Sequence, residues 1–251
     1  MSLRYLRLTC CVAVAAVCVP LAAPRAQSCP REAVATVGRV TVWRDAGKTA
    51  LLFAGGLAID ADGAPDAYHP DDRGTDHLAN AGKPGNWWGL ATENGQPVVQ
   101  GPDDPKPGYY VSTTALVDPS KPARSPSRYV DSSRIPYLAL PPAVLSPRLA
   151  GGARLGDFAA VVNTATGRVA FALIADVGPK DKIGEGSIAL ADALGVSSSP
   201  KRGGASRGIA VAVFPGSGNG RPRSLEEIRA VGARLLAGFG GAGRVEACTA
   251  K

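Results

Sequence analysis

The sequence predicts a mainly β fold with peripheral helices, in the α+β class. Glycine and proline contribute 31 and 21 of the 251 residues, a share that favours turns and short strands over a helical bundle. Apolar runs bounded by glycine recur along the chain, whereas only two segments keep a clear helical spacing. With 45% hydrophobic and 20% charged residues the chain can bury a core, which excludes a wholly disordered protein.

Residues 1–26 are typical of a secretory signal peptide. Two arginines precede an apolar run at residues 8–21 that is too short for an ordinary membrane span. We expect cleavage after Ala26, leaving a secreted protein, extracellular or periplasmic, that forms one domain over residues 27–251 and does not bind membranes. Loss of three arginines with the signal lowers the formal net charge from +7 to +4, and the scattered cations predict no nucleic-acid partner.

Two cysteines remain in the mature chain, Cys29 and Cys248, one near each end. An exported protein meets an oxidising compartment, so we expect them to form a disulfide. The alternatives are two free thiols or a lipid anchor on Cys29. The anchor is disfavoured because no large apolar residue stands at the preceding positions.

Strands are expected in three stretches that differ in amino-acid composition. Residues 34–59 are apolar and β-branched and predict two or three short strands. The following stretch to residue 147 is rich in Pro, Gly and Asp, and strands are expected at residues 97–100, 109–116 and 135–140, because a structureless loop of that length is improbable in a compact domain. Last come a buried hairpin and one further strand, at residues 159–162, 168–175 and 209–214.

Two helices are predicted from their capping residues. Ser187 is a natural N-cap for a helix over residues 188–194. Ser224 and Glu227 form a capping box ahead of a helix over residues 225–239, whose apolar residues keep helical spacing.

Two carboxylates nine residues apart are the candidates for catalysis. Asp176 ends a buried strand, and Glu185 is flanked by glycines that let the backbone approach a ligand. Such a pair can supply one proton donor and one base, the division of labour that cleavage of a glycosidic bond needs. The alternative is that Glu185 is only a partner for a helix dipole.

Other chemistries find little support. His69 and His77 lack a nucleophilic serine or cysteine context, and their spacing matches no common zinc pattern. The sequence DADG at residues 60–63 begins like a calcium loop but lacks the downstream bidentate glutamate, so we interpret it as a turn. No phosphate-binding motif is present. We therefore expect no metal and no cofactor.

A resemblance to a known enzyme family rests on six segments: LAIDADG at 57–63, IPYL at 135–138, ADVGP at 175–179, IGEGSIALA at 183–191, VFPGS at 213–217 and LEEIR at 225–229. Together they resemble chitosanases of glycoside hydrolase family 75, over most of the mature chain. That family's catalytic Asp and Glu match Asp176 and Glu185 at the same interval. The resemblance implies an endo-acting chitosanase that hydrolyses β-1,4 bonds between glucosamine units with inversion. Lys180 and Lys182 depart from the fungal pattern, and cations beside a cleft for a polyamine would oppose it.

The block around Asp176 also resembles double-psi β-barrel proteins, including endoglucanases, expansins and lytic enzymes, which implies a double-psi β-barrel-like core. Two other functions therefore stay open. One is a non-catalytic, expansin-like carbohydrate-binding protein, and the other is a barrel protein that acts on peptidoglycan.

The expected surroundings of the two carboxylates indicate their catalytic roles. We assign Asp176 as general base and Glu185 as general acid, because Ile183 and Ile188 would raise the pKa of Glu185. The roles could be exchanged. The expected partner is chitosan or a related amino-sugar polymer, and we expect a monomer.

Sugar binding recruits aromatic faces and acids, and the candidates lie in the turn-rich stretch. In each aromatic pair one ring is expected to point inward. For Asp60 and Asp62, turn formation explains the residues as well as ammonium binding does. The candidates are Trp87, Trp88, Tyr109, Tyr110, Asp60 and Asp62, with Asp103 and Asp104 nearby.

Overall fold

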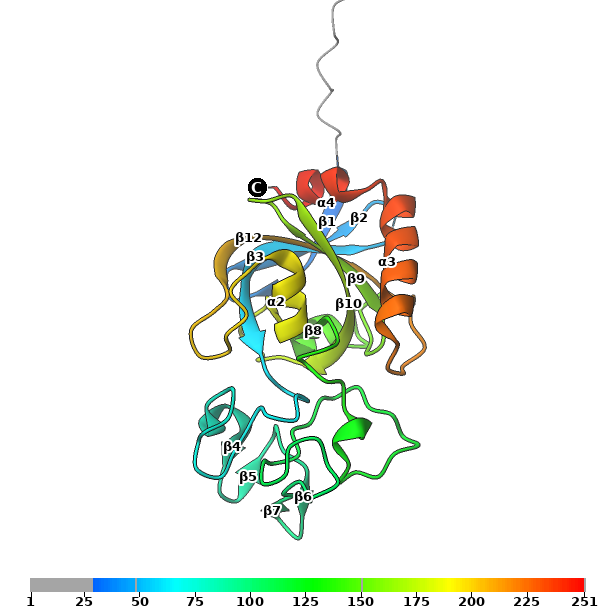
Figure 1. The fold of residues 1–251 in the computed structure, drawn as a ribbon. Helices are drawn as coiled ribbons and strands as arrows, with labels where there is room; N and C mark the ends of the chain where they lie inside the picture. The colour runs from blue at the N-terminus through cyan, green and yellow to red at the C-terminus, as the bar shows by residue number, and fades with distance from the viewer. Residues whose placement is uncertain (1–28, 48, 150, 251) are drawn as a thin grey trace, which may run out of the picture.

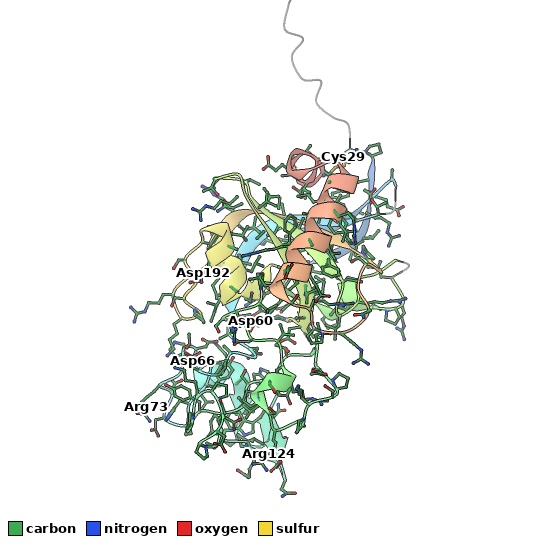
Figure 2. All side chains as sticks on the ribbon, turned by 45° about the vertical axis from the view of Figure 1, so that its right-hand side comes forward. Cys29, Asp60, Asp66, Arg73, Arg124 and Asp192 are labelled. Carbon is green, nitrogen blue, oxygen red and sulfur yellow. A yellow bond between two sulfur atoms is a disulfide. The ribbon has the colours of Figure 1, made fainter. Side chains whose placement is uncertain are left out.

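The computed structural model describes residues 29–47, 49–149 and 151–250 of the chain. The predicted signal at residues 1–26 lies outside the described residues. A β-barrel with helices around it forms one part of the structure, and an irregular segment, residues 61–136, forms the other (Figure 1). We call this second part the loop lobe. Cys29 lies at the end of the barrel away from the loop lobe, whereas Asp60 lies where the two parts meet (Figure 2).

Six strands close the barrel in the order β3, β11, β8, β10, β9 and β12, and β12 pairs back onto β3. The pairs β10–β8 and β11–β3 are parallel, and the other pairs in the ring are antiparallel. An N-terminal hairpin of β1 and β2 adds to β3. The predicted mainly β, α+β class is confirmed. The strands are β1 (Arg31–Val37), β2 (Val40–Asp45), β3 (Leu51–Asp60), β8 (Tyr137–Leu140), β9 (Phe158–Asn163), β10 (Arg168–Val177), β11 (Glu185–Ser187) and β12 (Ala205–Phe214).

Both faces of β9 are buried, which explains its unbroken apolar sequence. Ala159 and Val161 belong to the main core cluster, together with Leu57 and Ile174 from other barrel strands. Ala160 and Val162 belong to a second cluster that includes side chains of the C-terminal helices. The alternation follows the pleat of a strand, whose successive side chains point to opposite faces.

The two predicted helices are confirmed with their caps. In α2 (Ile188–Leu194) the Ser187 hydroxyl accepts a hydrogen bond from the Leu190 N–H at 3.1 Å. In α3 (Leu225–Phe239) both hydrogen bonds of the capping box are present. The sequence did not predict α1 (Pro142–Leu145), α4 (Ala242–Thr249) or the 3-10 turns η1 (Leu78–Ala81) and η2 (Pro126–Arg128). Of the helices in the described part of the chain, none has the length and apolar character needed to cross a bilayer.

The loop lobe contains less regular structure than predicted. It holds two small hairpins, β4 (Gly82–Lys83) with β5 (Asn86–Trp87) and β6 (Thr92–Glu93) with β7 (Gln96–Pro97). The strands predicted at 97–100 and 109–116 are wrong as extended strands: beyond β7 these segments meet other residues through the isolated bridges Val99↔Tyr110 and Leu90↔Ser112. Prolines remove backbone donors there and prevent a longer ladder. The strand predicted from residue 135 begins at Tyr137 as β8.

The predicted disulfide between Cys29 and Cys248 is present, with a Cα–Cα distance of 5.2 Å and a sequence separation of 219 residues. It ties the start of the described chain to α4. The Arg31 guanidinium, which lies 4.6 Å from the Trp43 ring centre, also donates hydrogen bonds to the carbonyls of Cys248 and Ala250.

Replacing both cysteines by serine is expected to lower the free energy of unfolding by about 4–5 kcal/mol, because the bridge restricts a very long loop in the unfolded chain. Urea titrations of the wild type and the double variant measure this difference. Reductant should shift the wild-type curve toward that of the variant and leave the variant unchanged. Coincident curves for both proteins without reductant would contradict the prediction.

Candidate active site

Acidic side chains stand on three barrel strands where the barrel meets the loop lobe. Asp60 is the last residue of β3, Asp176 lies near the end of β10, and Glu185 begins β11. Asp176 and Glu185 both pair with Ala139, from opposite sides of β8. Two strand spacings, about 10 Å, therefore separate their backbones, with only a methyl side chain between. Glu185 is a strand residue, and the helix predicted from Ser187 follows this strand directly.

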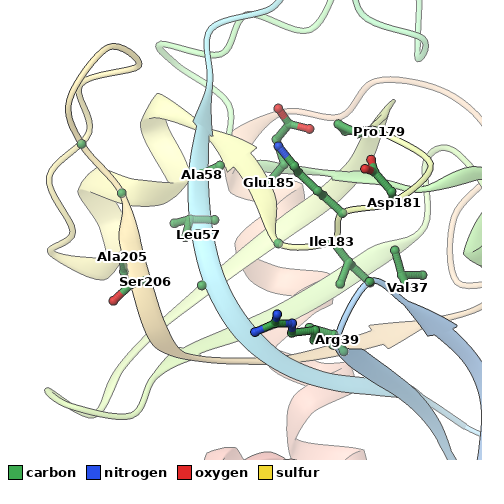
Figure 3. Close-up of a pocket in the computed structure, with 17 residues that line it drawn as sticks. Val37, Arg39, Leu57, Ala58, Pro179, Asp181, Ile183, Glu185, Ala205 and Ser206 are labelled. Atoms are coloured by element: carbon green, nitrogen blue, oxygen red, sulfur yellow. The ribbon is translucent and has the colours of Figure 1, made fainter.

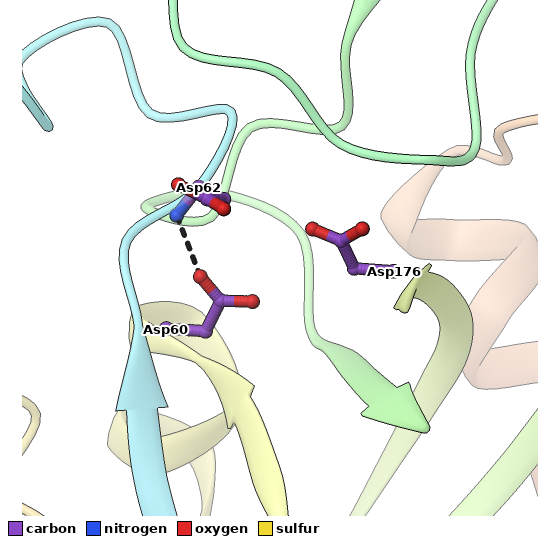
Figure 4. A group of neighbouring side chains, drawn as sticks. All are labelled: Asp60, Asp62 and Asp176. Carbon is purple, nitrogen blue, oxygen red and sulfur yellow. Dashed lines mark hydrogen bonds between the residues drawn. The ribbon is translucent and has the colours of Figure 1, made fainter. Parts of the chain in front are cut away.

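Three aspartates converge at this end of the barrel: Asp60, Asp62 and Asp176 (Figure 4). One carboxylate oxygen of each lies within 4.8 Å of the others. The Asp62 N–H donates to Asp60 Oδ1 at 2.8 Å, and Gly63 adopts a positive φ of 80°. The turn interpretation of residues 60–63 is therefore confirmed. Barrel closure brings this turn to Asp176, more than a hundred residues later in the chain.

Each aspartate of the trio is held in place by hydrogen bonds. Asp62 Oδ1 accepts the Tyr68 hydroxyl at 2.7 Å. Asp176 Oδ1 accepts two backbone N–H groups, those of Ala115 at 3.0 Å and Val177 at 2.7 Å. The first of these also fixes the loop lobe to the barrel. The cluster is therefore built into the contact between the two parts of the structure.

Burial and crowding of like charges raise the pKa values of these acids. Burial, followed by the charge of Asp60, raises the pKa of Asp176 to about 8. Burial raises the pKa of Glu185 to about 7, with Asp60 adding to the effect and Lys182 opposing it. Burial also raises the pKa of Asp60 to about 6, against the hydrogen bond from Asp62. The pKa of Asp62 is raised well above its usual value, first by burial and then by Asp60. At neutral pH the cluster therefore retains protons.

The same carboxylates are the described residues that could hold a divalent cation, since oxygen donors suit Mg²⁺ and Ca²⁺. One oxygen of each aspartate already accepts a hydrogen bond. The charge crowding can equally be relieved by protons shared among the acids, in agreement with the raised pKa values.

A cleft of about 710 Å³ opens between the acid cluster and the loop lobe. Glu185 and Asp60 line it, together with Trp88, whose side chain is 61% exposed. The Lys201 ammonium reaches from the segment before β12 to the Gly74 carbonyl at 2.8 Å, joining the barrel side to the lobe. Gly178 also lines the cleft, and a Cβ there would lie 3.1 Å from Glu185 Oε2. The glycine thus leaves room for the glutamate.

The cleft brings together only some of the predicted substrate-binding residues. Asp60 and Trp88 line it. Trp87 packs within the loop lobe, with its ring centre 6.4 Å from that of Tyr110. In this Trp pair one ring points inward and the other outward, as predicted. The ring centres of Tyr109 and His69 lie 4.8 Å apart in a T-shaped arrangement.

The remaining acids predicted near the cleft lie elsewhere. Asp62 stands in the trio and not among the cleft-lining residues. Asp103 and Asp104 line a separate cavity of about 490 Å³ between the loop lobe and the segment before α3.

Three other cleft residues were not selected from the sequence: Tyr68, Asp76 and Asn80. Asp76 is buried and accepts hydrogen bonds from the His77 N–H and from the Asn80 amide. Its charge contributes to the raised pKa values of Asp60 and Glu185. The turn-rich segment that carries these residues offered no spacing to distinguish them, although its excess of Asp was visible.

The raised pKa values predict that the protein loses stability as pH rises. Between the unfolded pKa values near 4 and the folded values of about 6, 7 and 8, the folded state binds more protons than the unfolded state. The stability from these groups is therefore fully present below about pH 4 and lost as pH rises to about 8, at up to about 1.4 kcal/mol per pH unit for each group. Urea titrations across this range measure the slope, and Asp176→Asn should flatten it. A wild-type slope no steeper than that of Asp176→Asn would contradict the prediction.

Comparison with protein-family models and with curated proteins finds no match for this sequence.

Proposed function

We propose that the protein is a glycoside hydrolase that cleaves β-1,4 bonds between glucosamine units of chitosan, acting within the chain and with inversion. The observation that carries the proposal is the open cleft of about 710 Å³ whose wall contains two carboxylates of raised pKa, Glu185 and Asp60, beside an exposed Trp88. Aromatic faces bind sugar rings through their apolar surface, and paired carboxylates supply the acid and the base of glycoside hydrolysis. The resemblance to family 75 chitosanases points to the same polymer.

Glu185 is the general acid in this mechanism. Its pKa of about 7 keeps it protonated in weakly acidic solution, and it lines the cleft where a glycosidic oxygen would lie. It donates its proton to that oxygen as the bond to the anomeric carbon breaks. A water molecule on the opposite face of the sugar loses a proton to the base while its oxygen bonds to the anomeric carbon. One water is consumed, and the proton passes from the base back to Glu185 through solvent.

Asp60 is the better-supported base. It lines the cleft, whereas Asp176 does not. Both carboxylates are nearly buried, Asp60 at 8% and Asp176 at 9% exposed, but Asp176 Oδ1 accepts hydrogen bonds from two backbone N–H groups. Asp60 also has the lower pKa, so it is ionised at a pH where Glu185 still holds its proton. We assign Asp176 a positioning role. The sequence predicted Asp176 as the base, and the pH profiles of the Asp60→Asn and Asp176→Asn variants distinguish the two assignments.

Three further expectations belong to the same proposal. The barrel is of the double-psi type, which its six strands and mixed parallel and antiparallel pairing support. The protein is exported, which the N-terminal sequence and the disulfide support. It acts as a monomer.

Reducing-end release from chitosan, chitin, cellulose and peptidoglycan by the purified mature protein tests the function. We expect release from chitosan, and nuclear magnetic resonance of the first product should show the inverted anomer. Release from peptidoglycan alone would replace chitosan by the lytic alternative. Binding without release from any polymer would support the expansin-like alternative and exclude the hydrolase.

A further inference from the structure

A second cavity adjoins the cleft at Glu185, which lines both. This cavity measures about 650 Å³ and lies over the turn between β1 and β2 and the segment before β11 (Figure 3). The two cavities share Ala58, Pro179, Glu185 and Gly203. A linear polymer in the cleft could therefore extend past Glu185 in both directions. We call the first cavity, with Asp60 and Asp76, the acidic arm, and the second the basic arm.

The two arms differ in charge. The acidic arm contains Asp60 and Asp76, and among the described residues no Lys or Arg lines it. The basic arm contains Arg39 and Lys182, with Asp181 as its one further acid besides the shared Glu185. A polymer with a cation on every sugar would therefore be attracted more strongly to the first arm than to the second.

The turn that carries Arg39 packs against the segment that carries Lys182. Arg39 follows Gly38 in the turn between β1 and β2, and Gly38 has a positive φ of 58°. A Cβ on Gly38 would lie 2.7 Å from the Asp181 carbonyl oxygen, so this turn packs directly against the segment that carries Lys182. The placement of Arg39 beside that segment is therefore set by packing and not by a flexible loop.

Both cations share the arm with acids, but neither lies in an ion pair in the described part of the chain. Within the described ranges, Arg39 and Lys182 form no ion pair or hydrogen bond with another side chain, and Lys182 acts on Glu185 only through its field. The floor below them is apolar, with Val37, Leu57 and Ile183. Cations outside any ion pair, beside an apolar floor, match a carboxylate carried on a short apolar substituent, because charge-assisted hydrogen bonds to carboxylate are the strong ones.

We propose that the basic arm binds a sugar unit that bears a carboxylate substituent, so that the preferred substrate is an amino-sugar polymer with acidic groups on one side of the cleaved bond. This inference rests on the proposed glycoside hydrolase function and names its substrate class. Such a carboxylate could belong to an ether-linked acid on the sugar or to a peptide attached through it. The shared chemistry is the carboxylate.

Binding and cleavage of two matched probes test the inference: a chito-oligosaccharide hexamer and its O-carboxymethylated form, both also prepared as polymers. We expect the wild type to bind the carboxymethylated hexamer about 10-fold more tightly by calorimetry, and the double variant Arg39→Gln/Lys182→Gln to lose that preference. Lys180→Gln is the matched control, since it removes an exposed cation from the same segment that does not line the arm. It should keep the preference. Thermal melting confirms that each variant is folded.

The outcomes separate the inference from the proposed function. If the wild type hydrolyses chitosan but binds both hexamers equally, the inference is overturned and the function stands. If it hydrolyses neither polymer but binds the carboxymethylated hexamer more tightly in a manner that depends on Arg39 and Lys182, the hydrolase proposal fails and the anionic site stands. Cleavage of peptidoglycan that needs the two cations would assign the carboxylate to an ether-linked acid or its peptide.

Discussion

Glu185→Gln is expected to reduce the rate of chitosan hydrolysis by about 10²- to 10⁴-fold, because glutamine cannot donate a proton to the glycosidic oxygen. Glutamine keeps the size of the side chain, so the approach to Gly178 is retained. It also removes an acid whose pKa is raised by burial, so the variant should be at least as stable as the wild type near pH 8. Initial rates of reducing-end release measure the effect, and urea titration checks the fold.

A substrate that needs no proton donor tests the assigned role of Glu185. With an aryl chito-oligosaccharide whose phenol is a strong acid, the leaving group departs unprotonated, so Glu185→Gln should recover most of the lost rate on that substrate. Glu226→Gln is the matched control, since this exposed glutamate lies on α3 away from the cleft. It should behave as the wild type does. Equal activity of Glu185→Gln and wild type on chitosan would exclude Glu185 as the acid.

Local signals predicted the parts of the fold that depend on near neighbours in the chain. The caps at Ser187 and Ser224 act over three residues, and both helices begin where these caps predict. The strand that ends near Asp176 was visible because both of its faces are buried, which leaves a continuous apolar run. The short helix α4 was missed because the sequence offers no side-chain N-cap for it; its N-cap is Gly241.

The site could be predicted only in part because it is assembled by barrel closure. The spacing of Asp176 and Glu185 is local, and the structure holds both against Ala139. The approach of Asp60 and Asp62 to Asp176 depends on the order of strands around the barrel, which no local pattern encodes. Loop residues such as Tyr68 reach the acids only through the packing of the loop lobe. Asp60, which the sequence predicted as a sugar-binding acid or a turn residue, is therefore the base we propose.

Asp60→Asn is expected to reduce hydrolysis by about 10²- to 10⁴-fold on chitosan and on the aryl substrate alike, because both reactions need a base for the attacking water. The wild-type rate should rise with pH as Asp60 ionises near 6 and fall as Glu185 loses its proton near 7. The plot of rate against pH is therefore a narrow bell, and its two apparent pKa values belong to the coupled cluster of acids and not to single residues. Asp60→Asn should remove the acid limb of this profile.

Asp176→Asn distinguishes the two candidate bases. If Asp176 only positions its neighbours, its loss should leave the acid limb in place, because Asp176, with a pKa of about 8, is already uncharged where Asp60 titrates near pH 6. The two backbone N–H groups that Asp176 accepts can still bond to the amide oxygen of asparagine. Asp192→Asn, on the exposed side of α2, is the matched control and should leave the profile unchanged. Loss of the acid limb in Asp176→Asn, with the limb retained in Asp60→Asn, would return the base role to Asp176. The pH profile decides between them because a merely structural defect lowers the whole curve without changing its shape.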